Sequence, residues 1–92
     1  MISVEATARF RECIRKLGLD RGTVFKVLIE VAAVWGRPHL HLGGGIRRLR
    51  GSVFECRFGR QVRFIFLHKP TGLIFDFAGN HDAIRAYLRN RS

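Results

Sequence analysis

Three charged side chains are predicted to gather on one face of a β-hairpin. Residues 53–58 and 62–67 each alternate between two kinds of side chain and are joined by a short glycine-containing turn. One of the two alternating sets of side chains is rich in phenylalanine and must face the core, so Glu55, Arg57 and Arg63 fall on the other face. Two arginines held close together favour an anion between them, and phosphate suits the planar guanidinium. A solvated cluster in which Glu55 pairs with the arginines explains the same pattern. If the arginines hold a phosphate, replacing Arg63 should leave the fold intact; if they only form salt bridges, the replacement should change stability and leave function alone.

His81 is placed where an acid or a base could act on a bound phosphate. It follows a predicted strand that ends at Ala78, and it stands in the first turn of a helix that Asn80 is expected to cap. An imidazole titrates near neutral pH, and the N-terminus of a helix offers free N–H groups to a phosphate. A capping or surface role is the alternative for a lone histidine here.

Four further arginines extend the basic surface of this half of the chain: Arg47, Arg48, Arg50 and Arg60. We expect them to contact the phosphates of RNA. The pleat of a regular strand predicts that Arg48 and Arg50 share one face and that Arg47 lies on the other. An edge strand protected by its charge against unwanted pairing is the alternative interpretation.

No metal site and no cofactor are expected. His39 and His41 form a His-x-His pair in a loop rich in proline and glycine, but zinc needs three or four ligands. His68, Cys13 and Cys56 do not complete such a set at a familiar spacing. Cys56 shares the core parity of its strand, which argues against a nucleophilic role.

Length and charge limit what these residues could serve. The chain has 92 residues, a mass of 10.6 kDa and 47% hydrophobic residues, enough for one domain spanning 1–92 with one core. Its two cysteines exclude a disulfide scaffold, no apolar run is long enough for a membrane span, and we expect no secretory signal. Of its net charge of +10, residues 37–92 carry +8. This clustering favours a polyanion or an acidic protein as the partner.

The first third of the chain predicts a strand and a helical hairpin. Residues 2–6 alternate, and a helix that begins after Thr7 carries apolar residues at helical spacing as far as Gly18. Asp20 is a natural cap for a second helix, which should end at the Gly36-Arg-Pro38 stop signal.

The remainder predicts an antiparallel meander and a final helix. Strands are expected over residues 46–50, 53–58, 62–67 and 73–78, with tight turns between them. The last helix carries an apolar stripe that includes Ile84, Tyr87 and Leu88. The fold class is therefore α+β: two N-terminal helices packed on a twisted, mainly antiparallel sheet, with a short C-terminal helix. We expect the helices to lie on one face of the sheet.

The segment from Gly45 to Leu88 resembles the RelE/ParE superfamily of toxins from bacterial type II toxin–antitoxin modules. The helical hairpin also fits, so the resemblance covers the whole chain. Four motifs carry it by their order and spacing: Ile46-Arg-Arg-Leu-Arg-Gly51, Phe54-Glu-Cys-Arg-Phe58, Val62-Arg-Phe-Ile-Phe66 and Phe77-Ala-Gly-Asn-His-Asp82.

The resemblance implies a site as well as a fold. RelE-like members are ribosome-dependent mRNA endonucleases that need no metal, and they use basic residues in the concave face of the sheet. By motif position Arg57 and Arg63 match such residues, and Tyr87 matches the aromatic residue of the last helix. His81 stands where RelE has an arginine and some RelE-like nucleases have a catalytic histidine. Glu55 stands where RelE has a lysine.

The resemblance also implies partners and alternatives. A cognate antitoxin that forms a hetero-oligomer with the toxin, mRNA on the ribosome, and a cytoplasmic location without a membrane are expected. ParE-like members share the fold but inhibit DNA gyrase without catalysis. A basic nucleic-acid-binding module without toxic activity is a third interpretation.

Overall fold

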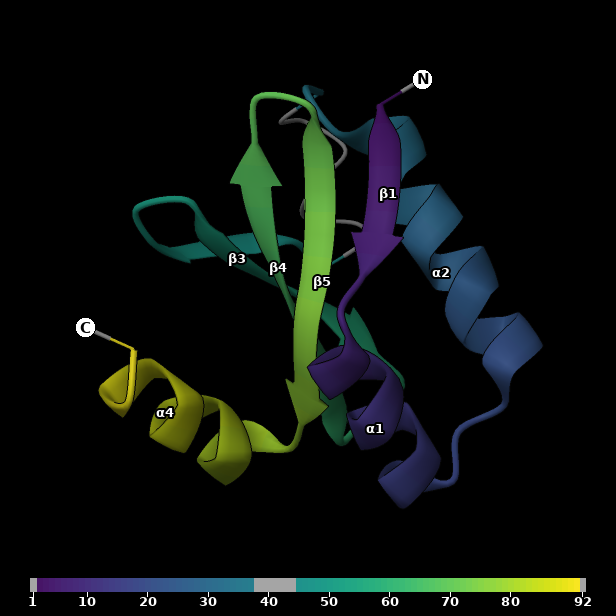
Figure 1. The fold of residues 1–92 in the computed structure, drawn as a ribbon, viewed down its shortest axis with the longest axis vertical. Coiled ribbons are helices and arrows are strands. Elements are labelled where there is room, and N and C mark those ends of the chain that lie inside the picture. Colours follow the sequence, from purple (N-terminus) through teal and green to yellow (C-terminus); the bar gives the residue numbers. More distant parts are fainter. Residues whose placement is uncertain (1, 38–44, 92) are drawn as a thin grey trace.

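The computed structural model describes residues 2–37 and 45–91, and Figure 1 shows how they are arranged. Every bound lies within two residues of the one predicted from the sequence. No helix in this described part of the chain is long and apolar enough to cross a membrane. The elements in chain order are β1 Ser3–Ala6, α1 Ala8–Leu17, α2 Arg21–Val34, β2 Arg47–Arg50, β3 Val53–Phe58, β4 Val62–Lys69, β5 Gly72–Gly79 and α4 His81–Arg89.

The strands form one mixed sheet in the order β1-β5-β4-β3-β2. Strands β2 to β5 pair antiparallel with their neighbours, and β1 lies parallel to β5 at one edge. The α+β class and the mainly antiparallel sheet predicted from the sequence are confirmed. The turn between β3 and β4 places Arg57 directly opposite Arg63, so the two arginines share one face of the sheet as expected.

Each helix begins at a side chain suited to that position. Thr7, Asp20 and Asn80 accept hydrogen bonds from backbone N–H groups in the first turns of α1, α2 and α4. Gly18 ends α1 in the left-handed conformation, with φ of 67°. The N-terminus of α4, and with it His81, is therefore fixed to the end of β5.

The helical hairpin packs on the phenylalanine-rich face of the sheet. Phe10 of α1 makes edge-on contacts with Phe64 and Phe75, at ring-centroid distances of 5.1 and 5.7 Å. The parity that the sequence assigns to the core is confirmed, because Cys56, Phe64 and Phe66 are fully buried. This cluster supplies most of the apolar burial that stabilises the fold.

The opposite face is also covered, which the sequence interpretation missed. Helix α4 packs there, on the other side of the sheet from α1 and α2. The expectation that all helices lie on one face is wrong. The physical reason is that β3 and β4 also carry three apolar side chains on this second face, and these must be shielded from water. The buried residues of this second cluster are Val53, Ile65, Leu67, Ile84 and Tyr87.

Candidate active site

A buried carboxylate, Glu55, pairs with one of the two opposed arginines, Arg63, and with Arg47 of β2. Glu55 is only 2% exposed; it accepts a 2.8 Å hydrogen bond from Nη1 of Arg63 and forms a 3.2 Å ion pair with Nη2 of Arg47. Arg57 is exposed and has no acidic partner among the described residues. Two cations thus pair with one anion, and a third cation on the same face of the sheet, Arg57, has no such pairing in the described part of the chain. Glu55 is ion-paired, as the alternative interpretation expected, but it is buried rather than solvated, and its partners are Arg63 and Arg47 rather than Arg63 and Arg57. The cluster keeps a surplus of positive charge that could hold a phosphate.

The pairing changes one expectation from the sequence. Because Arg63 stabilises a carboxylate that is withdrawn from water, its replacement should affect the stability of the fold as well as any binding. Replacement of the exposed Arg57 should not. The two arginines are equivalent in the sequence pattern but not in the structure.

A depression of about 190 Å³ opens at this cluster, and its wall depends on a glycine. Gly45 has a φ of 71°, and a Cβ there would collide with Nε of Arg57 and lie 3.0 Å from its Cγ. The Arg57 side chain therefore lies across Gly45, in space that any other residue would fill. The depression is lined by Gly45, Ile46, Arg47, Glu55, Arg57 and Arg63.

His81 stands at the end of the same row of residues. Arg57 pairs with Arg63 across β3 and β4, and Arg63 pairs with Gly79 across β4 and β5. His81 follows Gly79 by two residues and is exposed as the first residue of α4. The capping role falls to Asn80, whose side chain accepts a 2.9 Å hydrogen bond from the Ala83 N–H. The imidazole is therefore not used as the cap.

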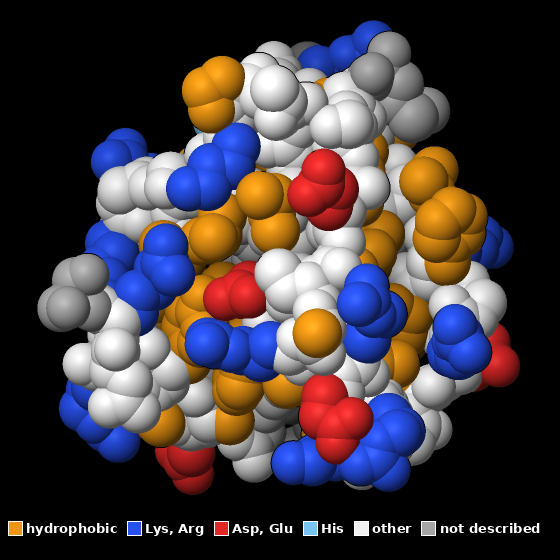
Figure 2. Space-filling view, viewed as in Figure 1, with side chains coloured by type: hydrophobic (Ala, Val, Ile, Leu, Met, Phe, Trp, Pro, Cys, Tyr) orange, Lys and Arg blue, Asp and Glu red, His pale blue; other side chains and the backbone are white. Residues whose placement is uncertain are grey.

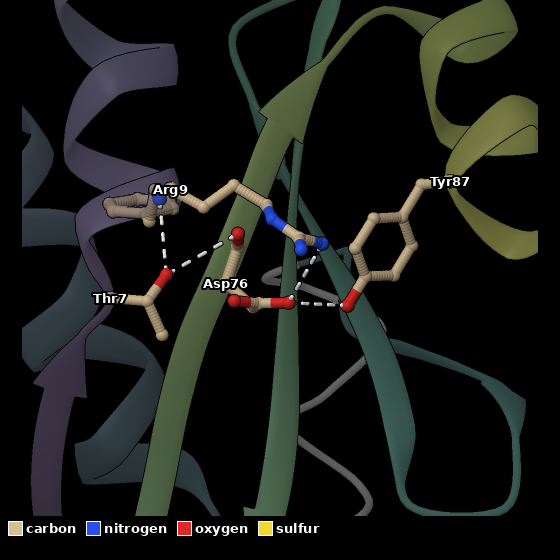
Figure 3. Close-up of polar contacts among 5 residues, drawn as sticks. Thr7, Arg9, Asp76 and Tyr87 are labelled. Carbon is tan, nitrogen blue, oxygen red and sulfur yellow. Dashed lines mark hydrogen bonds and ion pairs between the residues drawn. The ribbon is translucent and has the colours of Figure 1, made fainter. Parts of the chain in front are cut away.

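Tyr87 lies outside the arginine cluster. Its ring is buried and stacks on Phe77 at a centroid distance of 5.0 Å, and its hydroxyl donates a 2.7 Å hydrogen bond to Asp76. Arg9 of α1 lies 5.8 Å from the centre of the Tyr87 ring and 3.6 Å from the same carboxylate (Figure 3). Burial, followed by the hydrogen bond to Asp76 and the charge of that residue, raises the pKa of Tyr87 to about 12.

The predicted RNA-contacting arginines divide between the two faces of the sheet. Arg48 pairs with Phe54 and lies on the face of the sheet that α1 and α2 cover. Arg50 pairs with Val53 and faces α4. The prediction that Arg48 and Arg50 share a face is wrong, because a register irregularity between them inserts an extra residue into β2. Arg50 donates to the carbonyls of Leu88 and Arg91, which satisfies the C-terminal end of α4.

Arg60 lies exposed in the turn between β3 and β4, next to the Arg57 end of the cluster.

The remaining candidates concern metals and cysteines. His39 and His41 lie outside the described residues. Within the described ranges no group of three or more His, Cys, Asp or Glu side chains is placed to hold a metal ion. Burial raises the pKa of Cys56 to about 12, which agrees with its predicted inert role in the core.

Sequence reasoning missed Gly45 and Asp76. Gly45 ends a run of three glycines, so the sequence alone does not indicate which glycine lies against the Arg57 side chain. Asp76 carried a usable signal, because it is a lone acid inside the apolar segment Leu73–Ala78. It marks a register shift between β4 and β5, and the shift points its carboxylate towards helices on both faces of the sheet.

Solved structures of bacterial toxins share this fold. A copper-bound mutant toxin from Helicobacter pylori is 21% identical with a TM-score of 0.71, and covers 91% of this chain and 99% of its own. YafQ from E. coli is 16% identical with a TM-score of 0.66, over 91% and 98%. YafQ in the E. coli DinJ-YafQ toxin-antitoxin complex is 15% identical with a TM-score of 0.62, over 90% and 96%.

These likenesses show that the chain has the fold of YafQ and of the Helicobacter pylori toxin, an α+β fold as the sequence resemblance implied. The alignments extend over nearly the full length of both partners, so the shared unit is the whole domain. No protein-family model matches the sequence, and no curated protein matches it.

Proposed function

We propose that this chain is the toxin of a type II toxin–antitoxin module and cleaves mRNA on the ribosome without a metal ion. The observation that carries the proposal is the opposed pair Arg57 and Arg63, held beside an open depression in a fold shared with toxins. The surplus of positive charge in the second part of the chain supports RNA as the substrate.

The residues suit attack of an RNA 2′-hydroxyl on the adjacent phosphate. This reaction needs a base at the 2′-hydroxyl, an acid at the departing 5′-oxygen and cations against the phosphorane. Arg57 and Arg63 supply the cations. His81, exposed at the end of the same row of residues, supplies the acid or the base. Glu55 is the second candidate base, and it also fixes the direction of the Arg63 guanidinium.

Tyr87 acts through position rather than contact in this proposal. Its ring and hydroxyl are engaged by Phe77 and Asp76, so it holds α4 against the sheet. Since His81 is the first residue of α4, this packing sets where the imidazole stands. Arg47, Arg48 and Arg60 would contact RNA phosphates, whereas Arg50 mainly secures the end of α4.

The proposed partner in the resting cell is a cognate antitoxin, in a cytoplasmic hetero-oligomer. The E. coli YafQ structure with DinJ is a toxin–antitoxin complex with this fold, which supports the pairing. The net charge of +10 favours an antitoxin with an acidic segment. Association should slow as salt rises, and stopped-flow rates that are independent of salt would contradict this.

The test is cleavage of mRNA on translating ribosomes by the purified protein. Mapping of RNA ends should show cuts that depend on the ribosome, persist in EDTA-treated toxin preparations and leave a 2′,3′-cyclic phosphate. The Arg37→Ala variant is a matched control, because it removes an exposed arginine that neither lines the depression nor belongs to the proposed RNA contacts.

A ParE-like gyrase inhibitor is the second candidate, and two observations favour it. The Glu55 carboxylate already holds two arginines through Oε2, and the Tyr87 hydroxyl already donates to Asp76, so both groups are committed to contacts within the protein. Inhibition of gyrase supercoiling with no mRNA cleavage would establish this candidate. RNA binding without either effect would establish the simple nucleic-acid-binding module.

A further inference from the structure

A second hollow lies between the start of α1 and helix α4, over strand β5. Its volume is about 560 Å³, which is in the size range of small-molecule sites. Figure 1 shows α1 and α4 on either side of the lower end of β5. Among the described residues the hollow shares none of its lining with the depression at Arg57 and Arg63. We call it the Arg9 pocket, and its lining includes Arg9, Phe77, Ala83, Ala86, Asn90 and Arg91.

The apolar part of this lining combines an aromatic ring with small side chains. Phe77 of β5 is half-buried, and its ring stacks on Tyr87 at a centroid distance of 5.0 Å, which holds it in one orientation. Ala83 and Ala86 lie three residues apart on the side of α4 that lines the pocket. Because their side chains are single methyl groups, the space beside the Phe77 ring stays open. A flat apolar group, such as a fused aromatic ring, fits this space.

The polar part of the lining is basic. Arg9 on α1 and Arg91 after α4 both line the pocket, and its described lining contains no acidic residue. The charges of both arginines also reach the Tyr87 hydroxyl, where they oppose the rise in its pKa that burial and Asp76 cause. On the side of β5 that α4 occupies, Figure 2 shows hydrophobic side chains bordered by Lys and Arg. An anionic group is therefore favoured beside the apolar space.

Arg9 is oriented before any ligand is bound. Its guanidinium lies 3.6 Å from the Asp76 carboxylate, which is itself held by a 2.7 Å hydrogen bond from the Tyr87 hydroxyl (Figure 3). The Asp76 side chain is only 15% exposed, whereas that of Arg9 is 61% exposed. Arg9 thus keeps most of its five N–H donors available to an incoming anion. Asp76 acts as a fixed anchor for the arginine and not as part of the pocket lining.

We propose that the Arg9 pocket binds a nucleotide, with the phosphate held by Arg9 and Arg91 and the base laid against Phe77. Aromatic rings that stack on bases, together with arginines that contact phosphates, are how proteins hold nucleotides without reading their sequence. Asn90 adds an amide that can both donate to and accept from the edge of a base. The nucleotide is either free or part of an RNA strand, because the two present the same chemistry. The proposal does not rest on mRNA cleavage, since the pocket stands apart from Arg57 and Arg63.

The test is an amide chemical-shift titration of the full chain with three separate probes: adenosine 5′-monophosphate, adenosine and inorganic phosphate. The monophosphate should shift the resonances of Phe77, Ala83 and Ala86 in a saturable way. It should bind roughly tenfold more tightly than either fragment, because it alone makes both the stacking and the charged contacts. Added salt should weaken its binding.

A short oligoadenylate distinguishes the two sources of the nucleotide. Tighter binding of the oligonucleotide than of the monophosphate at the same resonances would support an RNA strand as the ligand. Equal binding would support a free nucleotide. Neither measurement needs mRNA cleavage, so failure of the proposed activity and failure of this proposal are distinguishable.

Two pairs of variants test the residues of the pocket. Arg9→Gln should weaken binding of the monophosphate roughly tenfold, the effect of losing one charge-assisted hydrogen bond. Arg89→Gln is its matched control, because Arg89 is an exposed arginine of α4 that does not line the pocket. Ala86→Leu fills the space beside Phe77 and should abolish binding, whereas Ala33→Leu, at an exposed alanine of α2, should not. Thermal unfolding of each variant ensures that folded proteins are compared.

Four results would overturn the proposal. The first is the absence of saturable shifts at Phe77, Ala83 and Ala86, including the case in which the shifts are confined to β3 and β4. The second is binding of adenosine or of phosphate as tight as that of the monophosphate. The third is wild-type affinity in a folded Ala86→Leu protein. The fourth is an equal loss of affinity in Arg9→Gln and Arg89→Gln, which would indicate attraction by net charge alone.

Discussion

Replacement of Arg63 by alanine should cost stability as well as function, and the structure gives the size of the effect. The substitution removes the 2.8 Å hydrogen bond to a carboxylate that is only 2% exposed. Hydrogen bonds to charged groups contribute about 1.5–3 kcal/mol. Arg63 is itself 35% exposed and Arg47 remains at 3.2 Å, so the lower end applies, about 1–2 kcal/mol. For a domain of this size that lowers the melting temperature by roughly 5–15 °C.

The assay is thermal unfolding followed by circular dichroism, with a double-mutant cycle. Arg63→Ala combined with Glu55→Gln should recover part of the loss, because the carboxylate that lacked its partner is then uncharged. Arg57→Ala is the matched control and should melt with the wild type, since Arg57 is exposed and has no acidic partner among the described residues. A wild-type melting temperature for Arg63→Ala, or strictly additive effects in the cycle, would refute the reasoning.

Two further predictions concern the tyrosine and the glycine beside the cluster. The pKa of Tyr87, the single tyrosine, is raised to about 12, so its contribution to stability should be complete below pH 10 and lost between pH 10 and 12. Ultraviolet titration of the tyrosine should follow its ionisation. A titration midpoint near pH 10 would contradict the burial of Tyr87 and its hydrogen bond to Asp76. Gly45→Ala should cost about 1–3 kcal/mol through its positive φ and also lower mRNA cleavage by displacing Arg57. Gly59 has a φ of 68° and open space around it, so Gly59→Ala should cause similar backbone strain but keep the cleavage activity. Equal cleavage activities of Gly45→Ala and Gly59→Ala would contradict the role given to Gly45.

Local rules were sufficient for the elements of this fold. The caps Thr7, Asp20 and Asn80, the glycine turns and the period-2 alternation of β3 and β4 are all written in short stretches of sequence. The opposition of Arg57 and Arg63 follows from the same alternation once the turn between the strands is short.

Tertiary contacts account for what the sequence did not reveal. The irregularity in β2 that turns Arg50 towards α4 leaves no mark in the string Arg47-Arg-Leu-Arg50, because bulges are set by pairing and not by composition. Helix α4 packs on the second face of the sheet because Ile65 and Leu67 are apolar there. The sequence pattern hides this, because charged residues such as Arg57 and Arg63 lie on the same face. Likewise, that Glu55 is buried between two arginines is visible only when β2 is laid beside β3.

The measurement that tests the central claim most directly is the single-turnover rate of mRNA cleavage on ribosomes by wild type and Arg57→Ala, with their melting temperatures measured on the same samples. Arg57 is the arginine whose loss should leave the fold unchanged. If it stabilises the phosphorane, the rate should fall by roughly 10²–10³ while the melting temperature stays the same. Equal rates for the two proteins, or no cleavage by a wild type that inhibits gyrase, would contradict the account.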